Sequence, residues 1–313
     1  MSKAAEGDRP SAADWVAGHL SSQVGRVFVV TGANSGLGLE TARSLGALGG
    51  AVIMAARDME KGEAAVDSLR AEQPDGRFDL RHLDLADLDS VREFAAGVEH
   101  VDVLVNNAGV MTPPRSLTEQ GYELQFGVNH LAHFALTILL FNTLLRGEDP
   151  RVVTVSSTLH KRGRIHFEDL HGEHGYHRTK YYAQSKLANV VFALELHRRL
   201  RTAGFPLRSV LAHPGHAATN LQTSGPTGVG KLMMKMTNRV MAQDVATGAL
   251  PQIYAAAGAD VESGQFWGPD GRNEGKGFPA LVEPLDEARD RELGKRLWDI
   301  SEELTGVHID LAP

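Results

Sequence analysis

The chain has 313 residues, of which 42% are hydrophobic, enough to bury a large core. A formal net charge of −7 disfavours nucleic acid as the main partner, and the lack of cysteine excludes disulfides and thiolate metal sites. Residues 1–10 are polar, and the most apolar stretch, 131–141, is too short to cross a bilayer. We therefore expect no integral membrane segment and a cytoplasmic location.

Short apolar runs alternate with segments of helical pattern along the chain. The expected strands are 26–30, 51–56, 78–82, 101–105, 151–155 and 207–211, with a last edge strand at 264–267. The expected helices are 39–45, 60–72, 90–98, 121–145, 182–202 and 287–304. Strands separated by helices of this length predict βαβ units, and hence an α/β fold whose parallel sheet has helices on both faces.

The domain organisation is expected to be simple. No repeat and no linker divides the sequence, so residues 23–313 are predicted to form a single domain. Residues 1–22 are expected to be a flexible arm, with a short helix around Trp15 left open.

A glycine-rich turn follows the first expected strand. The sequence TGANSGLG at residues 31–38 leads into the first expected helix, and its glycines are Gly32, Gly36 and Gly38. This order predicts a phosphate site, because the free N–H groups and the dipole of the helix face an anion. The spacing is G-x-x-x-G-x-G and not the ordinary G-x-G-x-x-G, so a tight turn without a ligand stays an alternative.

The carboxyl ends of the expected strands carry further candidate residues. Open parallel sheets bind ligands at this edge. The residues that fall there, besides Gly32, are Asp84, Asn107, Ser157 and Pro214.

The helix after Ser157 carries a tyrosine and a lysine, Tyr182 and Lys186, four positions apart on one face. An ammonium beside a phenol favours the phenolate and is expected to lower the pKa of the tyrosine. Such a tyrosine can give a proton to an alkoxide forming at a carbonyl, or take one from an alcohol. The hydroxyl of Ser157 can hold the substrate oxygen. The alternative is a solvated helix face without chemistry.

Together these motifs resemble the short-chain dehydrogenase/reductase family over roughly residues 24 to 310. The similarity rests on the glycine turn, Asp84-Leu85, residues 106–109 (NNAG), Asn129, Ser157, Tyr182 with Lys186, and Pro214-Gly215 with Thr219, in the family's order. Residues 125–131, 164–167 and 297–301 are similar to the retinol-dehydrogenase-like branch, as is the insert at 160–180.

The resemblance implies a doubly wound Rossmann-type sheet of about seven strands and a nicotinamide cofactor. It implies Tyr182 as general acid/base, Lys186 holding the ribose, Ser157 polarising the carbonyl and Asn129 supporting a proton relay. It places Asp84 at the adenine and Thr219 near the carboxamide. The implied cofactor contacts are Gly32, Asn34, Ser35, Gly36, Leu37, Gly38, Asp84, Leu85, Asn107, Ala108, Gly109, Tyr182, Lys186, Pro214, Gly215 and Thr219.

The end of the second strand bears on the choice of cofactor. NAD-specific relatives usually carry an acid where this chain has Ala56, and Arg57 follows it. Arg57 can form paired, charge-assisted hydrogen bonds to a 2′-phosphate. Asp58 is expected to point away, toward the start of the next helix, where the dipole favours an acid. We therefore expect NADP to be preferred, with NAD as a second cofactor.

The predicted function is an NADP-preferring carbonyl reductase or alcohol dehydrogenase acting on a small lipophilic ketone, aldehyde or alcohol. A homodimer is compatible with this prediction. One alternative is a non-catalytic cofactor-sensing or interaction protein on the same fold. Another is a sugar-nucleotide epimerase or dehydratase of the family's extended branch, although its usual G-x-x-G-x-x-G spacing is absent.

Several other patterns invite competing interpretations. Tyr176 and Lys180 form a second Tyr-x-x-x-Lys pair, in a loop that precedes the apolar periodic run. The histidines of this loop suggest a metal, but without a defined geometry no metal is expected; they are His171, His174 and His177. Residues 225–231 imitate a P-loop but lack the Ser or Thr that binds magnesium.

The methionine-rich part of residues 216–245 falls where relatives place a lid over the substrate. Methionine suits an adaptable apolar pocket. A helix packed on the core, or a membrane-surface role for Lys231 and Lys235, are the alternatives for this segment.

Overall fold

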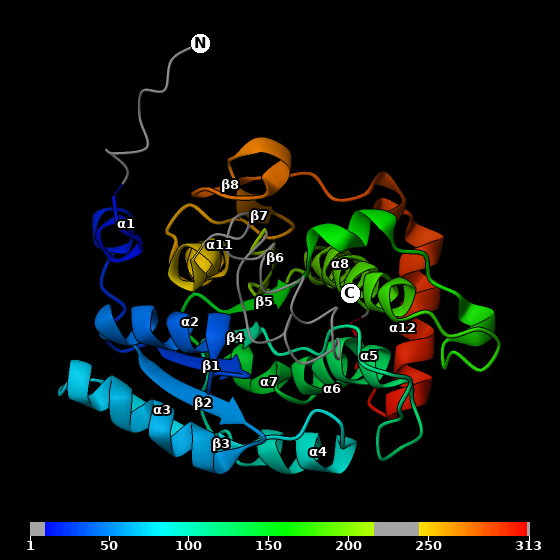
Figure 1. Ribbon diagram of the computed structural model, residues 1–313, viewed down its shortest axis with the longest axis horizontal. Helices are drawn as coiled ribbons and strands as arrows, with labels where there is room; N and C mark the ends of the chain where they lie inside the picture. The colour runs from blue at the N-terminus through cyan, green and yellow to red at the C-terminus, as the bar shows by residue number, and fades with distance from the viewer. Residues whose placement is uncertain (1–9, 216–243, 312–313) are drawn as a thin grey trace, which may run out of the picture.

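The computed structural model describes residues 10–215 and 244–311, and its centre is one sheet (Figure 1). The strand order is β3-β2-β1-β4-β5-β6-β7-β8; β1 to β7 are parallel, and β8 runs antiparallel to β7. The strands are β1 Val27–Thr31, β2 Ala51–Ala56, β3 Arg77–His82, β4 Val103–Asn106, β5 Arg151–Val155, β6 Arg208–Ala212, β7 Phe266–Pro269 and β8 Pro279–Leu281. The predicted doubly wound Rossmann-type fold is confirmed, but β7 is not the edge because β8 pairs beyond it.

Helices cover both faces of this sheet, and Figure 1 shows them on either side of the strands. One face carries α2 Gly36–Ala47, α3 Met59–Glu72 and α11 Val245–Ala257, and the other carries α4 Leu88–Ala96, α6 Ala132–Leu139 and α8 Arg178–Ala203. The helix α12 Arg291–Thr305 packs against α8 and α6. Among the described residues, none of the helices is long and apolar enough to cross a membrane.

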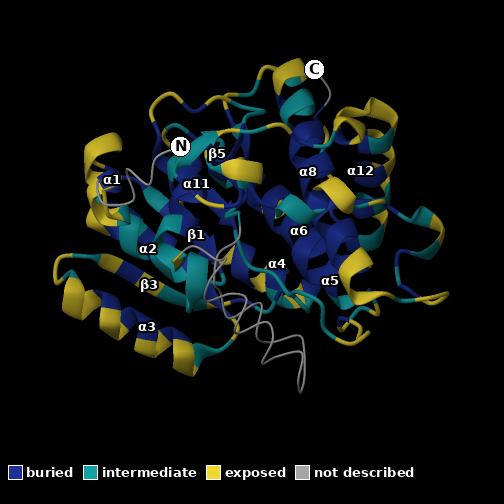
Figure 2. Ribbon diagram, turned by 45° about the horizontal axis from the view of Figure 1, so that its top comes forward, coloured by how far each residue is buried: buried dark blue, intermediate teal, exposed yellow. Residues whose placement is uncertain are grey.

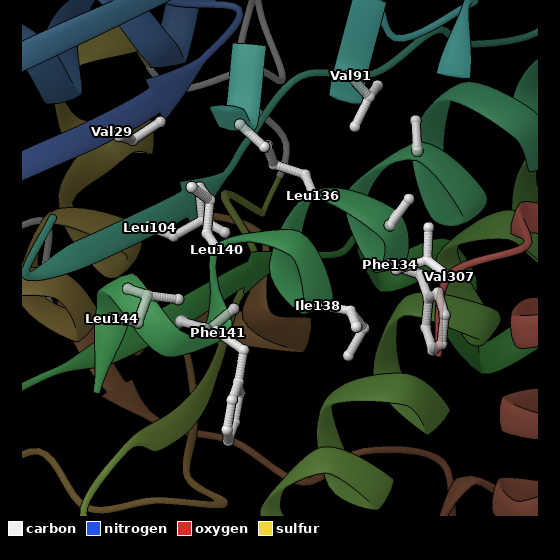
Figure 3. Packing of buried hydrophobic residues seen from close by; sticks show 14 of the residues in the cluster. Val29, Val91, Leu104, Phe134, Leu136, Ile138, Leu140, Phe141, Leu144 and Val307 are labelled. Carbon is white, nitrogen blue, oxygen red and sulfur yellow. The ribbon is translucent and has the colours of Figure 1, made fainter. Parts of the chain in front are cut away.

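Alternate residues of each strand face opposite layers of the core. Val29 of β1 packs with α4 and α6, in the cluster drawn in Figure 3, whereas its neighbours Phe28 and Val30 pack with the cluster under α2 and α11. Figure 2 shows the interior of the fold buried, whereas the outer side of α3, which packs against β3 and β2 at one edge of the sheet, is exposed. The sheet is therefore held rigidly from both sides, and its carboxyl edge provides a fixed platform.

The long helix predicted over 121–145 is interrupted. It consists of α5 Leu124–Phe126, a π-helical turn η1 Gly127–Leu131, α6, and α7 Phe141–Leu144. The buried carboxylate of Glu123 accepts the N–H groups of Gln125 and Phe126, so the helix begins only at 124. The π turn carries Asn129 at its centre, and such turns are frequent at functional sites.

The N-terminal segment contains the short helix around Trp15 that the sequence left open, and residues 12–19 are packed against the fold rather than flexible. The helix α1 Ala12–His19 is capped by Ser11 and buries Trp15, which is 7% exposed. The Trp15 indole stacks on Phe278, with ring centroids 6.0 Å apart, and meets Tyr254 of α11 edge-on. Burying so large an aromatic surface outweighs the polar character of the segment.

Candidate active site

The glycine turn after β1 has the geometry of a phosphate cradle. Gly32 and Gly36 have positive φ angles of 67° and 57°, which disfavour other residues. A Cβ on Gly38 would lie 2.4 Å from the carbonyl oxygen of Gly32. The helix α2 begins at Gly36, and Ser35 at its N-cap makes no side-chain cap hydrogen bond. The first turn of α2 therefore presents N–H groups that suit a pyrophosphate, with half-buried Asn34 and Leu37 in the same turn.

The NNAG segment after β4 is tied directly to this turn. Asn107 donates from Nδ2 to the Thr31 carbonyl at 2.7 Å, while its Oδ1 accepts from Gln252 of α11 at 3.0 Å. The backbone N–H groups of Asn107 and Ala108 both donate to Oγ1 of Thr31, at 3.0 and 2.9 Å. Sequence reasoning missed Gln252, because no motif marks a contact from so distant a part of the chain.

The ends of β2 and β3 lie on the same edge. Arg57 is exposed after β2, and Asp58 caps α3 by accepting the Lys61 N–H at 3.1 Å. Hydrogen bonds from Lys61 lower the pKa of the Asp58 carboxyl. The expected orientation of Asp58 toward the next helix is thus confirmed. After β3, the Asp84 carboxylate accepts the Ala86 N–H at 2.9 Å, and Leu85 beside it is buried.

The helix α8 buries both members of the expected Tyr-x-x-x-Lys pair. Tyr182 is 4% exposed and Lys186 is 3% exposed, and the helix begins four residues before Tyr182, earlier than predicted. The Lys186 ammonium donates to the carbonyl of Val155, at the end of β5, at 3.1 Å and lies 5.9 Å from the centroid of the Tyr182 ring. A solvated helix face is therefore excluded for this pair.

The two serines after β5 have different partners. Ser156 donates to the backbone carbonyl of Lys186 at 2.8 Å, whereas Ser157 accepts the Leu159 N–H at 3.2 Å and lies near the Tyr182 hydroxyl, whose pKa it lowers. The structure thus brings Ser157, Tyr182 and Lys186 into one cluster at the carboxyl end of β5.

Burial determines the protonation of this cluster. It raises the pKa of Tyr182 to about 12, with the hydrogen bond from Ser157 opposing the rise. Burial likewise lowers the pKa of Lys186 to about 8. The expected net lowering of the Tyr182 pKa by Lys186 is therefore wrong, because desolvation of the phenolate outweighs the nearby positive charge.

Asn129 lies beside this cluster and is fully buried. Its Oδ1 accepts the Val110 N–H at 2.8 Å, and its Nδ2 donates to the Val110 carbonyl at 3.0 Å and to Ser185 at 2.9 Å. A Cβ on Gly109 would lie 3.0 Å from this Oδ1 and 3.6 Å from Nζ of Lys186. The Asn129 side chain thus fixes the NNAG segment against α8.

The competing tyrosine belongs to a different cluster. The hydroxyl of Tyr176 lies 3.1 Å from the Glu123 carboxylate and accepts from Nε2 of Gln125 at 2.8 Å. Burial and the Glu123 charge raise the pKa of Tyr176. Lys180 is exposed in the first turn of α8. Tyr176 therefore anchors the insert to the start of α5.

The loop histidines each have a separate contact. His171 stacks on Tyr122 with centroids 5.6 Å apart, His174 lies 3.8 Å from Asp169, and His177 caps α8. Within residues 10–215 and 244–311, no three His, Asp or Glu residues are arranged to hold a metal.

The expected site continues beyond β6. Pro214 and Gly215 follow this strand, and Gly215 has a φ of 62°. Three predicted features lie outside the described residues: Thr219, the P-loop-like stretch at 225–231, and the lid at 216–245 except for its last two residues.

Comparison with known proteins defines the class. The family model described as short chain dehydrogenase matches residues 26–228, and the chain belongs to that family. It is 41% identical to human retinol dehydrogenase 13, covering 90% of this chain and 85% of the relative, and 42% identical to mouse polyprenol dehydrogenase, covering 92% and 86%.

Comparison with solved structures supports the same family assignment. A crystal structure of an uncharacterized protein from Mycobacterium Paratuberculosis has 44% identity and a TM-score of 0.79, covering 96% of this chain and 99% of that one. An NADP-bound structure from Beutenbergia cavernae, described as an NAD(P) dependent gluconate 5-dehydrogenase, has 26% identity and a TM-score of 0.61, covering 78% and 95%. The chain is therefore an NAD(P)-dependent dehydrogenase of the retinol-dehydrogenase-like branch, acting on CH–OH or C=O groups.

Proposed function

We propose that this dehydrogenase interconverts a lipophilic aldehyde or ketone and its alcohol, with NADP as the preferred cofactor and Tyr182 as general acid/base. The observation that carries the proposal is the buried cluster of Ser157, Tyr182 and Lys186 at the carboxyl end of β5. A phenol, a hydroxyl and an ammonium converge there, beside the edge of the sheet that carries the phosphate cradle.

The protonation of this cluster favours reduction at neutral pH. With a pKa near 12, the Tyr182 hydroxyl is protonated and can donate to an alkoxide that forms at the substrate carbonyl. Ser157 holds the carbonyl oxygen within reach, and the Lys186 ammonium stabilises the phenolate that remains. The nicotinamide cofactor, when bound, supplies or accepts the hydride.

The cofactor preference rests on Arg57 and Asp58. Arg57 is exposed beyond β2, free to meet a 2′-phosphate, whereas Asp58 is engaged at the start of α3. Gly32, Gly36 and Gly38 form the cradle for the pyrophosphate. The NADP in the Beutenbergia cavernae structure supports the same cofactor here.

The substrate class rests on the relatives and on the residues near Gly109. Retinol and polyprenol, for which two relatives are named, are apolar alcohols. Val110 and Met111 follow Gly109 as half-buried apolar side chains, and Val110 is bound to Asn129. These apolar residues close to Asn129 and the names of the two relatives together support a lipophilic carbonyl as the substrate.

The test is cofactor oxidation at 340 nm with a panel of carbonyls, using NADPH and NADH in parallel. The panel pairs long-chain aldehydes and retinal with short polar aldehydes, and a sugar nucleotide serves as the control for the epimerase alternative. We expect turnover with NADPH and the apolar members. Cofactor binding without any turnover would support the non-catalytic alternative. A homodimer and a cytoplasmic location stay predictions from the sequence.

A further inference from the structure

Three charged or polar side chains from distant segments meet beside the active-site edge. The Nζ of Lys161 lies 2.5 Å from Oε1 of Glu274, and Nε2 of His213 lies 3.2 Å from Oε2 of the same carboxylate. His213 is fully buried and Glu274 is largely buried. The nearby His213 ring and the Lys161 ammonium lower the pKa of Glu274 to about 2, so it is a carboxylate at neutral pH.

Lys161 belongs to the turn that follows Ser157. This 3-10 turn, η2 Thr158–Arg162, is fixed to Ser157 because the His160 N–H donates to the Ser157 carbonyl at 3.0 Å. The His160 ring contacts the same carbonyl through Nδ1 at 2.6 Å. A change in the position of Lys161 would therefore move the segment that carries the Ser157 hydroxyl.

His213 lies on the opposite side, between β6 and Pro214-Gly215. Its Nδ1 accepts the Gly215 N–H at 3.1 Å, so the neutral ring carries its proton on Nε2, which faces Glu274. Gly268 of β7 leaves room for the ring, since a Cβ there would lie 2.3 Å from Nε2 of His213. In this tautomer the nitrogen that faces the Glu274 carboxylate is the one that carries the proton.

Glu274 itself is held in an unusual conformation. Glu274 has a φ of 54°, in the left-handed region that costs a residue of its type roughly 1 kcal/mol or more, and it follows Asn273, which tolerates the same conformation more readily. The backbone of Glu274 and Gly275 lies in close contact with Gly215. A Cβ on Gly215 would lie 2.5 Å from the Gly275 oxygen and 2.8 Å from the Glu274 oxygen. Such strain persists only where the surrounding structure enforces it, and functional sites are where it clusters.

We propose that Glu274 is a positioning residue that sets the spacing between the Ser157 turn and the Gly215 peptide by binding Lys161 and His213 together. The inference rests on the proposed function, in which Ser157 orients the substrate oxygen and Gly215 lies beside the cofactor. Glu274 acts through its partners and touches neither reactant. A shift of about 1 Å in such a group can cost about 100-fold in rate.

The experiment compares Glu274→Gln with Glu283→Gln, a matched loss of one carboxylate from the same C-terminal segment. Glu283 is highly exposed and, among the residues that the structure describes, its carboxylate pairs with Arg289 at the surface, so its loss is expected to be silent. In Glu274→Gln the amide nitrogen meets either the ammonium or the Nε2–H, so one partner is lost. We expect kcat for the carbonyl to fall about 10- to 100-fold and KM for NADPH to rise less, by at most about 10-fold, because the Gly215 peptide shifts while the glycine turn is untouched.

Lys161→Met and Lys161→Arg form the second pair. Lys161 is partly exposed, so Lys161→Met should fold normally and show the same loss in kcat as Glu274→Gln. The double variant should lose little more than either single variant, because both changes break one interaction. Lys161→Arg keeps the positive charge and should retain most of the wild-type activity. Hydrogen exchange of residues 157–162 is expected to rise in Glu274→Gln and not in Glu283→Gln. An inactive wild type would overturn the proposed function alone, and hydrogen exchange would still test whether Glu274 positions the Ser157 turn. Unchanged kcat and exchange in Glu274→Gln, or equal losses in Glu283→Gln, would overturn the inference.

Discussion

The hydroxyl of Thr31, the last residue of β1, lies 3.0 Å from Nε2 of His133 on α6. The His133 Nδ1 contacts the carbonyl of Asn129 at 3.1 Å, so this nitrogen carries the proton and Nε2 accepts from Thr31. The same hydroxyl accepts the N–H groups of Asn107 and Ala108. One buried oxygen thus joins the glycine turn, the NNAG segment and the π turn of Asn129.

Removing that oxygen should damage stability and cofactor binding together. Thr31→Val keeps the shape but leaves the Ala108 N–H and the His133 ring nitrogen without this partner, at a cost of about 2–4 kcal/mol in the free energy of unfolding, while the Asn107 N–H keeps the Val105 carbonyl at 2.9 Å. Thr31→Ser keeps the hydroxyl and serves as the control, with a cost below about 1.5 kcal/mol. Urea denaturation and NADPH titration measure both effects. Equal behaviour of the two variants would show that the hydroxyl has no structural role.

Local motifs made much of the site predictable from sequence. The glycine turn needs only a strand, three glycines and a helix, and Tyr182 with Lys186 needs only the four-residue spacing of one helix. Asp58 was predictable as a cap because the cap is local too. These features depend on neighbours in the chain, which the sequence displays directly.

Contacts between distant segments were not predictable in this way. His133 looked like part of an apolar helix, and nothing near Glu274 in the sequence announces Lys161 or His213. The packing of the N-terminal helix was not predictable because Trp15 finds its partners about 240 and 260 residues away, at Tyr254 and Phe278. The Tyr182 pKa was wrong in direction because burial depends on the whole fold.

The two serines after β5 should differ sharply when each is replaced by alanine. Ser157→Ala removes the hydroxyl that faces Tyr182, and kcat is expected to fall about 100- to 1,000-fold. Ser156→Ala removes only a hydrogen bond to the Lys186 carbonyl, costing about 1 kcal/mol of stability with kcat nearly unchanged. Steady-state kinetics and thermal unfolding separate the two. A larger kinetic loss in Ser156→Ala would contradict the arrangement.

Arg57 should decide the choice between the two cofactors. Arg57→Ala is expected to weaken NADPH binding about 10- to 100-fold, the loss of charge-assisted hydrogen bonds to a phosphate, and NADH binding less than about 3-fold. Arg289→Ala, which removes an equally positive but remote side chain, should leave both unchanged. Fluorescence titrations of both cofactors provide the measurement. A wild type that prefers NADH, or an Arg57 variant that loses both equally, would falsify the assignment.

Buried histidines should make the protein sensitive to mild acid. Burial lowers the pKa of His130 to about 3, and that of His133 and His160 to about 4, from an ordinary value of 6.5. Below pH 6.5 the unfolded chain therefore takes up protons that the folded chain refuses, and the free energy of unfolding falls as pH drops. Each histidine contributes about 1.4 kcal/mol per pH unit between 6.5 and its folded pKa.

Urea denaturation at pH 7.0, 6.0 and 5.0 tests this dependence, above the range where most carboxylates titrate. His160→Gln should show a shallower decline than wild type because one of the three groups is gone. A stability that stays constant from pH 7.0 to 5.0 would mean that these rings are not buried as neutral groups.

The most direct measurement of the central claim is turnover of Tyr182→Phe beside Tyr176→Phe, with a lipophilic aldehyde and NADPH. Tyr182→Phe should lose about 10²- to 10⁴-fold in kcat while its NADPH dissociation constant stays within about 3-fold of wild type, because only the proton donor is removed. Tyr176→Phe should stay active, with only its anchoring contacts to Glu123 and Gln125 lost. Full activity in Tyr182→Phe, with an inactive Tyr176→Phe, would contradict the account.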